Sequence, residues 1–231
     1  MKLSSADINE IKAFISKRGF TEPDLQMEIT DHVACRVKEI ISTEPQTSLT
    51  QAINITHSEF GVMGFSVFED AMRSNLQKRY FKLFINFWLG NFNFKTLPLM
   101  VSVVYLCSIV FRVIHKPEMI FNVTGLLLIG GLVVHGQFNS VRFKRYNKML
   151  TFKMGSSFLI ISVALFQLYN LLIIQLEVYK QLNTIMLGVF YGFVMVLLLA
   201  TIYTVNKAQQ HAVDSCIELE EKYKLIKSST I

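Results

Sequence analysis

The sequence predicts an all-α protein with a small N-terminal helical domain, a four-helix transmembrane bundle and a helical C-terminal tail. Three observations lead to this prediction: a low share of charged residues, four long runs without any charge, and apolar residues that recur at helical spacing. Apolar residues make up 52% of the 231 and charged residues 17%, whereas soluble domains carry about 25% charged residues. With a mean hydropathy of +0.39, the chain is expected to be neither disordered nor an ordinary soluble enzyme.

The charge-free runs cover residues 96–111, 119–141, 154–176 and 181–206. A bilayer core about 30 Å thick is crossed by roughly 20 helical residues, and the last three runs reach that length unaided. The first run has only 16 residues, so its helix must continue past Arg112, whose long side chain can extend to the headgroups. We therefore expect four spans within a transmembrane domain of residues 96–206.

Basic residues gather on one side of the expected spans. Lysines and arginines precede the first span, lie between the second and third in residues 142–153, and follow the fourth at Lys207. Cytoplasmic loops are rich in such residues, so both termini are expected in the cytoplasm of a multi-pass protein of the inner (plasma) membrane. The basic excess lies in the apolar half, which indicates membrane orientation rather than nucleic-acid binding. The chain starts without an apolar core, so no cleavable signal peptide is expected. In a reducing compartment no disulfide is expected either.

Residues 1–82 are expected to form a cytoplasmic domain of four helices. Ser4 with Asp7 has the pattern of a capping box, and Pro23 occupies a favoured first-turn position of a second helix that should end near Ile41. The other expected boundaries are Gly19 and Gly61 as exits of the first and third helices, and Ser48 and Ser66 at the starts of the third and fourth. Period-two alternation is absent over any useful length, so strands are not expected.

Part of this domain resembles a known family. Residues 25–32 (LQMEITDH), 48–53 (SLTQAI) and 59–61 (EFG) are similar to the HAAS-type α-helical signalling domain, which carries an E-I-x-D-H helix, a Ser-capped helix and a closing F-G. The resemblance covers residues 8–65, about a quarter of the chain, and departs from the pattern at residues 44–46, where EPQ replaces a glycine-containing turn. It implies a non-catalytic module that precedes membrane spans or accompanies transcription regulators. The transmembrane half carries no such resemblance.

The sharpest candidate site lies on the second helix, where Glu28, Asp31, His32 and Cys35 fall on one face. A carboxylate, an imidazole and a thiol could ligate zinc, with His57 as a further ligand. However, the apolar stripe of the same helix is centred on the other side, so the four side chains should face solvent or a partner. The alternative interpretation is that Asp31 and His32 form hydrogen bonds between helices. We therefore assign no metal and no cofactor, and the zinc site stays an alternative. The stripe consists of Leu25, Ile29, Val33, Val37 and Ile40.

Residues 83–95 are expected to form an interfacial elbow, because Trp88 and several phenylalanines lie there beside basic residues and such side chains prefer the headgroup zone. The elbow should break at Gly90-Asn91. The sequence does not decide whether this elbow anchors the chain in the membrane or senses lipids.

Polar residues inside the spans are uncharged. Gln167 and Asn170 lie in the third span, and Asn122, Thr124 and His135 lie in the second. Such side chains usually bond to neighbouring helices, whereas a transport pathway would more often carry an ionisable residue at mid-depth.

Two patterns bear on helix packing. Gly188 and Gly192 form a small-xxx-small motif that allows close helix approach, either within one subunit or between two copies. Beyond the fourth span, apolar residues continue at steps of three or four through residues 205–226. The cytoplasmic tail, residues 207–231, is therefore expected to extend the fourth span as a helix that docks on the head or associates with itself.

We expect no enzymatic activity, because the sequence contains no phosphate-binding glycine loop, HExxH, GxSxG or paired-cysteine motif. The expected function is that of a signalling, regulatory or scaffolding protein, with the bilayer as one partner and a cytoplasmic protein or a second copy as another. Coupling between membrane and head would pass through the fourth head helix. The alternative is a small transporter or accessory permease subunit with a polar cavity lined by Asn122, Gln167 and Asn170.

Overall fold

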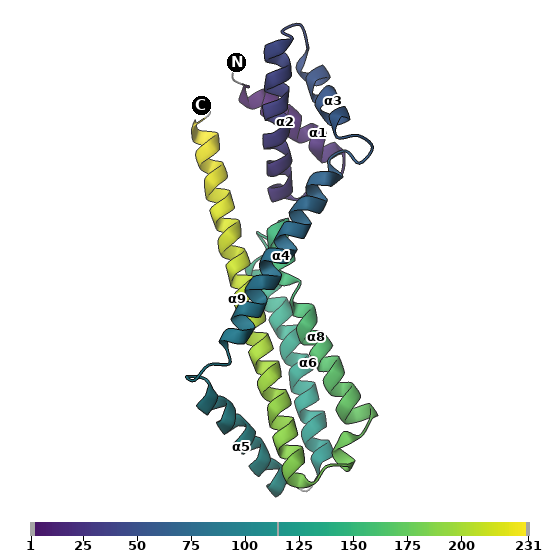
Figure 1. Ribbon diagram of the computed structural model, residues 1–231, viewed down its shortest axis with the longest axis vertical. Coiled ribbons are helices and arrows are strands. Elements are labelled where there is room, and N and C mark those ends of the chain that lie inside the picture. The colour runs from purple at the N-terminus through teal and green to yellow at the C-terminus, as the bar shows by residue number, and fades with distance from the viewer. Residues whose placement is uncertain (1–2, 115, 230–231) are drawn as a thin grey trace. The chain divides into compact units, whose positions relative to one another are not determined.

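The computed structural model describes residues 3–114 and 116–229, the side chains at 174, 175, 178 and 224–229 excepted. Throughout this part of the chain the regular secondary structure is helical, which confirms the predicted all-α class (Figure 1). The chain divides into two compact units, and each is described by itself below. Unit 1 comprises Met1–Arg79, Arg145–Gly155 and Ala212–Ile231, and unit 2 comprises Tyr80–Lys144 and Ser156–His211.

The helices of the N-terminal region begin and end where local signals place them. Ser4 and Asp7 form a reciprocal capping box at the first helix, and Ser48 forms one with Gln51 at the third. Gly19, at φ +94°, follows the first helix in the left-handed region that glycine tolerates best. These ends confirm the expected boundaries, and only the second helix runs slightly further than expected. The helices are α1 (Ser5–Lys17), α2 (Pro23–Thr43), α3 (Leu49–Glu59) and α4 (Ser66–Gly90).

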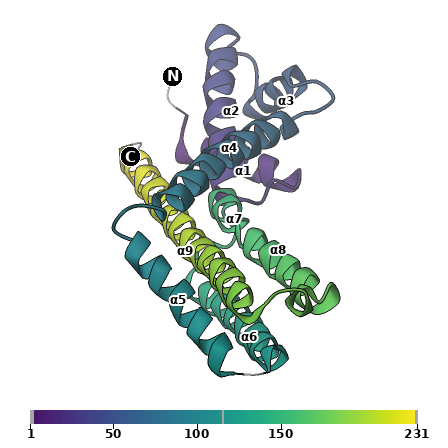
Figure 2. The ribbon, with the colours of Figure 1, turned by 60° about the horizontal axis from the view of Figure 1, so that its bottom comes forward.

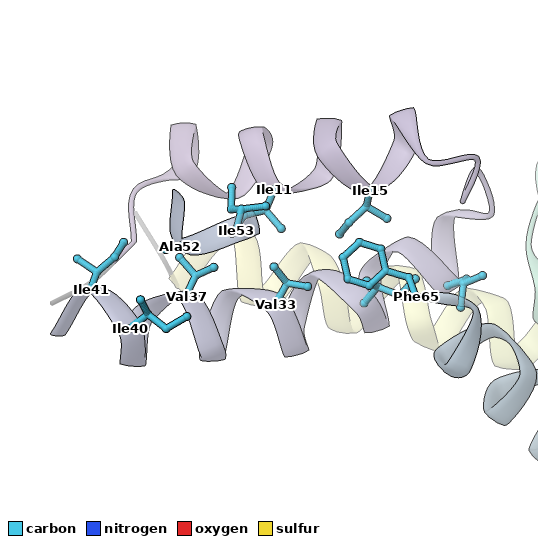
Figure 3. Packing of buried hydrophobic residues seen from close by; sticks show 11 residues of the cluster. Ile11, Ile15, Val33, Val37, Ile40, Ile41, Ala52, Ile53 and Phe65 are labelled. Atoms are coloured by element: carbon cyan, nitrogen blue, oxygen red, sulfur yellow. The ribbon is translucent and has the colours of Figure 1, made fainter. Parts of the chain in front are cut away.

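The core of unit 1 lies between α1, α2 and α3. Figure 3 shows Ile11 and Ile15 of α1 facing Val33 and Val37 of α2, with Phe65 closing one end. The apolar stripe predicted for α2 is buried along its whole length. The full cluster consists of Ile11, Ile15, Leu25, Ile29, Val33, Val37, Ile40, Ile41, Ala52, Ile53 and Phe65.

Two later segments of the chain complete unit 1. One contains α7 (Leu150–Ser156), and the other is the C-terminal part of α9 (Thr184–Ser229). Leu150 and Cys216 are fully buried, and Phe152 is almost so. The segment expected as a basic loop at residues 142–153 is thus partly helical, and its last residues are packed in unit 1.

Unit 2 contains the apolar helices. Three stretches are long and apolar enough to cross a membrane: Pro117–Arg142, Leu150–Ile173 and the helix Thr184–Tyr223. This agrees with a membrane protein. The first predicted span forms a shorter apolar helix, Leu97–Val113, of 17 residues, which extends about 25 Å. The elements are α5 (Leu97–Val113), α6 (Pro117–Arg142), α8 (Leu159–Asn170), η1 (Leu171–Gln175), η2 (Val178–Lys180) and the first part of α9.

In unit 2, α8 and α6 lie beside the first half of α9, and α5 lies on the other side of α9 (Figures 1 and 2). A Cβ atom added to Gly188 would come within 2.6 Å of the Cα of Ser108, and one added to Gly192 within 2.7 Å of the Cα of Val104. The backbones of α9 and α5 therefore touch at both glycines. The small-xxx-small motif packs two helices of the same chain, which is one of the two roles that the sequence left open.

Helix α4 is continuous from Ser66 to Gly90. Residues 83–90 therefore prolong the fourth head helix, and the helix ends at the Gly90-Asn91 break that the sequence indicated. In the same way α9 continues without interruption beyond the last apolar run, as expected for the tail. Its 46 residues make a helix about 70 Å long, more than twice the thickness of a bilayer core.

Candidate functional site

The candidate site is a junction within unit 1 where three segments of the chain meet at the carboxylate of Asp24. One Asp24 oxygen accepts the backbone N–H of Leu150 at 2.8 Å, and the other accepts that of Thr151 at 2.7 Å. The first oxygen also accepts the N–H of Leu25 at 3.1 Å. Asp24 is 4% exposed, so its charge is sheltered from water. The start of α2 thus satisfies the free amides at the start of α7.

The third segment is α9, which reaches the junction at Cys216. Burial, together with the nearby carboxylate of Asp24, raises the pKa of the Cys216 thiol to about 12, while a hydrogen bond with the backbone of Phe152 acts in the opposite direction. The thiol is therefore neutral at physiological pH and is not a nucleophile. We call Asp24, Leu150, Thr151, Phe152 and Cys216 the three-segment junction.

Two ion pairs at the rim of the junction join the same three segments. Lys153 lies 2.9 Å from Glu22, next to the start of α2. Partial burial acts to raise the pKa of Glu22, but the hydrogen bond from Lys153 and the nearby positive charges leave it lowered overall. Arg145 pairs with Glu220 of α9 at 2.6 Å. These pairs, each of which joins an exposed basic side chain to a half-buried carboxylate, lie at the surface and contribute little individually.

The tail also contacts α2 away from the junction. The hydroxyl of Tyr223 donates to a carboxylate oxygen of Asp31 at 3.4 Å. Burial, followed by the carboxylates of Asp31 and Glu28, raises the pKa of Tyr223, so it stays a neutral donor. The partner of Asp31 in this structure is thus the tail.

Chemically, the junction is closed. The Asp24 carboxylate already accepts three N–H groups, so both of its oxygen atoms are occupied within the protein. The arrangement holds segments together and leaves no open position for a substrate.

The zinc candidates are not brought together. Glu28 and His32 lie 3.5 Å apart on the exposed side of α2, and the His32 ring packs on Phe68 with centroids 4.9 Å apart. Cys35 is exposed. Across the described residues, three or more His, Cys, Asp or Glu side chains are nowhere grouped in a way that could hold a metal ion.

His57 lies elsewhere in the head, against aromatic rings. Its ring lies 4.8 Å from that of Phe65 and 5.8 Å from that of Phe14. Arg18 donates through Nε to His57 Nε2 at 3.2 Å. Burial and the positive charge of Arg18 lower the pKa of His57 below its usual 6.5. His57 is therefore a neutral acceptor that joins α1 to α3.

The polar residues expected in the spans lie in different surroundings. Asn122 and Gln167 are exposed on their helices and Asn170 is half-buried. The buried polar contact between α6 and α8 instead joins Thr124 and Tyr169, whose hydroxyl oxygens lie 3.1 Å apart.

His135 belongs to a second polar cluster in unit 2. Its ring is bonded to the Asn139 amide at 2.8 Å, and Asn139 also donates to Gln209 of α9 at 2.8 Å. Asn139 and Gln209 are both buried. This amide pair fixes the register between α6 and α9, as interhelical hydrogen bonds do in membranes.

One exposed apolar feature of unit 1 is the turn between α3 and α4. Val62 is fully exposed and Met63 is 59% exposed, and Val67 at the start of α4 is 49% exposed. The glycines on either side, Gly61 and Gly64, have positive φ values of 64° and 53°, which shapes a tight turn that presents these side chains. We call Val62, Met63 and Val67 the apolar tip.

Sequence reasoning missed Asp24, the central residue of the junction. In the sequence it follows Pro23 and has the appearance of an ordinary first-turn carboxylate. The available signal was the short apolar run at residues 149–152 within a basic segment, which is unusual for an exposed loop. Comparison of the chain with protein-family models, with curated protein sequences and with solved structures found no match.

Proposed function

We propose that this chain is a non-catalytic regulatory protein of the inner (plasma) membrane, whose helical head binds a cytoplasmic protein and responds to its own membrane spans. The observation that carries the proposal is the three-segment junction. There the head is built together with the residues that lead into the third span and with those that continue the fourth. The resemblance of residues 8–65 to the HAAS-type signalling domain supports the same assignment.

The composition of unit 1 also supports four spans. A compact unit with a buried apolar core and charged surface lies on one side of a membrane, so the chain between Arg79 and Arg145 crosses an even number of times. Helix α6 is long enough to cross, so α5 would be the other crossing, the first of the four. Its 17 residues are few for a span, and local thinning of the bilayer compensates at modest cost. The distribution of basic residues supports a cytoplasmic location for unit 1 and both termini.

Coupling would pass through the junction as well as through α4. Leu150 and Thr151 begin the helical stretch of the third span, and Cys216 lies on the helix of the fourth. A change in the tilt of the fourth span therefore acts on the Cys216 side of the junction through one continuous helix, whereas a change in the third span acts on the hydrogen bonds of Asp24 across the two-residue turn between α7 and α8. Because a buried carboxylate is costly to leave unpaired, the junction favours two discrete states, formed and released.

The apolar tip is the surface at which a partner would bind. Scattered apolar residues are common on protein surfaces, but Val62 and Met63 are consecutive in a glycine-bounded turn and Val67 follows four residues later at the start of α4, all three of them exposed. Contiguous exposed apolar groups often mark interaction sites.

In-cell photocrosslinking tests the proposal. A photoreactive amino acid at Val62 should capture one specific cytoplasmic protein, whereas the same amino acid at Lys17, exposed on α1, should not. Asp24→Asn should change the yield at Val62 while the protein remains in the membrane, because the head would be released from the spans. Equal capture at both positions, or a yield at Val62 that Asp24→Asn leaves unchanged, contradicts the proposal.

A further inference from the structure

Unit 2 contains a groove of about 460 Å³ that no function considered so far requires. Its walls come from the end of α4, the bend that follows, the start of α5, and the middle of α9. The volume falls within the range of small-molecule sites, about 300–1,000 Å³. The lining residues used below are Asn86, Leu99, Val103, Val196, Leu199 and Lys207.

The groove has an apolar part and a polar end. Leu99, Val103, Val196 and Leu199 line the apolar part. At the polar end Lys207 places its ammonium group 4.7 Å from the centre of the Phe87 ring, a cation–π contact that holds the charge at the mouth. The lining includes no carboxylate, so the groove carries a net positive charge.

Hydrogen bonds fix the wall between α4 and α9. Asn91 donates through its amide to the hydroxyl of Thr204 at 2.8 Å, and the indole of Trp88 donates to the hydroxyl of Thr201 at 3.1 Å. Both acceptors are buried. The groove is thus a formed feature of the helix packing.

The depth of the groove in the bilayer follows from the sequence of α9. Lys207 is the first charged residue after the apolar run of residues 181–206, so the polar end lies at the headgroup level. Trp88 is bonded to Thr201, six residues before Lys207 on α9, and aromatic side chains prefer the membrane interface. The apolar part therefore reaches into the hydrocarbon region.

We propose that this groove binds one anionic phospholipid, with its phosphate at Lys207 and Asn86 and an acyl chain along Leu99, Val103 and Leu199. Charge complementarity favours the anionic headgroup. Leu99 is 67% exposed and Leu199 is 55% exposed, so the groove opens toward the lipid that surrounds the helices. A ligand from the bilayer enters it without crossing a polar layer.

A second groove in unit 2 provides a contrast. It has about 500 Å³ and is lined by Leu182, Ile185, Met186, Val189, Phe190 and Phe193, all of them apolar. It can accept acyl chains but has no group that selects a headgroup. The proposal rests on α5 and α9 crossing the bilayer, and it does not depend on partner binding by the head.

Fluorescence quenching tests the proposal with the full-length chain, because Trp88 is its one tryptophan and adjoins the groove. The protein is reconstituted in phosphatidylcholine vesicles that contain increasing fractions of phosphatidylglycerol with brominated acyl chains. Half-maximal quenching should occur at a low fraction of this lipid. Lys207→Gln should raise that fraction about fivefold, as expected for the loss of one lysine from an anionic-lipid contact.

Matched variants separate the groove from general surface charge. Lys144→Gln removes one exposed positive charge outside the groove and should leave the fraction unchanged. Leu199→Phe, which narrows the groove, should weaken quenching, whereas Leu126→Phe on a lipid-exposed face of α6 should not. Circular dichroism checks that each variant keeps its helical content.

Four results would overturn the proposal. Equal shifts for Lys207→Gln and Lys144→Gln would mean that only surface charge attracts the lipid. Equal quenching by brominated phosphatidylcholine would mean that the headgroup is not selected. Relief of quenching by excess soluble glycerol phosphate would identify a free phosphate ester as the ligand. A dimer in which neither lipid quenches Trp88 would show that a second copy fills the groove.

Discussion

The carboxylate of Asp24 accepts the backbone N–H of Thr151 at 2.7 Å, although the two residues are 127 positions apart in the sequence. The head domain therefore provides the N-terminal capping group of α7, the short helix that precedes the apolar helix α8. A capping group normally comes from the residue directly before a helix. Here it comes from another segment, so the helix start and the head depend on each other.

Replacing Asp24 tests this dependence. Asp24→Asn keeps the size of the side chain but loses the negative charge and turns an N–H group toward a backbone donor. We expect a loss of about 2 kcal/mol, as for a hydrogen bond to a charged group. Hydrogen exchange at the amides of Leu150 and Thr151 should become about thirtyfold faster. Asp70→Asn, at an exposed position of α4, is the control and should leave exchange at these amides unchanged.

Gly188 is expected to tolerate no side chain. A Cβ atom there would lie 2.6 Å from the Cα of Ser108, and backbone cannot move aside as a flexible side chain does. Gly188→Ala should therefore lower thermal stability in lipid or detergent by about 1–3 kcal/mol, as overpacking does. Gly130→Ala in α6, where nothing lies within 4 Å, should not. A stable Gly188→Ala variant that loses only dimers would show that the motif acts between copies.

Acidification should loosen the contact between α1 and α3 through His57. Because the pKa of His57 is lowered from 6.5, the unfolded state binds a proton more readily than the folded state. The contribution of His57 is fully present above pH 6.5 and is lost as the pH falls through its folded pKa. Hydrogen exchange of α3 should therefore accelerate between pH 7 and about pH 5.

Two substitutions isolate this effect. His57→Asn removes the titrating group and should flatten the pH dependence of exchange in α3. His32→Asn changes the exposed histidine of α2 and should leave that dependence as it is. A pH dependence that survives in His57→Asn would assign the titration to another group.

Cysteine labelling tests the proposed topology. In a chain whose native cysteines are replaced by alanine, Lys148→Cys should stay unlabelled when an impermeant maleimide is added to intact cells. Lys116→Cys, between the first and second spans, should be labelled under the same conditions. Labelling of Lys148→Cys from outside would contradict both the orientation and the four-span arrangement.

Features that depend only on residues close together in the chain could be predicted from the sequence. The capping boxes at Ser4 and Ser48 and the left-handed exits at Gly19 and Gly61 involve residues within a few positions of each other. The apolar stripe of α2 follows from helical periodicity alone. These signals predicted the helices of the head to within about two residues.

Contacts between distant segments could not be predicted in the same way. Nothing local distinguishes Asp24 from a first-turn carboxylate in water, and the segment that buries it comes after two apolar helices. The glycine motif showed that a close neighbour was required, but the neighbour, α5 at Val104 and Ser108, is set by the packing of unit 2. The groove at Lys207 depends on the same packing and left no pattern in the sequence.

The pairing of Asp24 with residues 150 and 151 also determines an order of events during synthesis. The core of α1, α2 and α3 can form as soon as those helices leave the ribosome, but the amides that Asp24 needs are translated about 126 residues later. Until then its carboxylate stays hydrated. A nascent chain therefore completes its head only after the intervening apolar helices have been synthesised, so a chain that stops before residue 150 keeps an incomplete head.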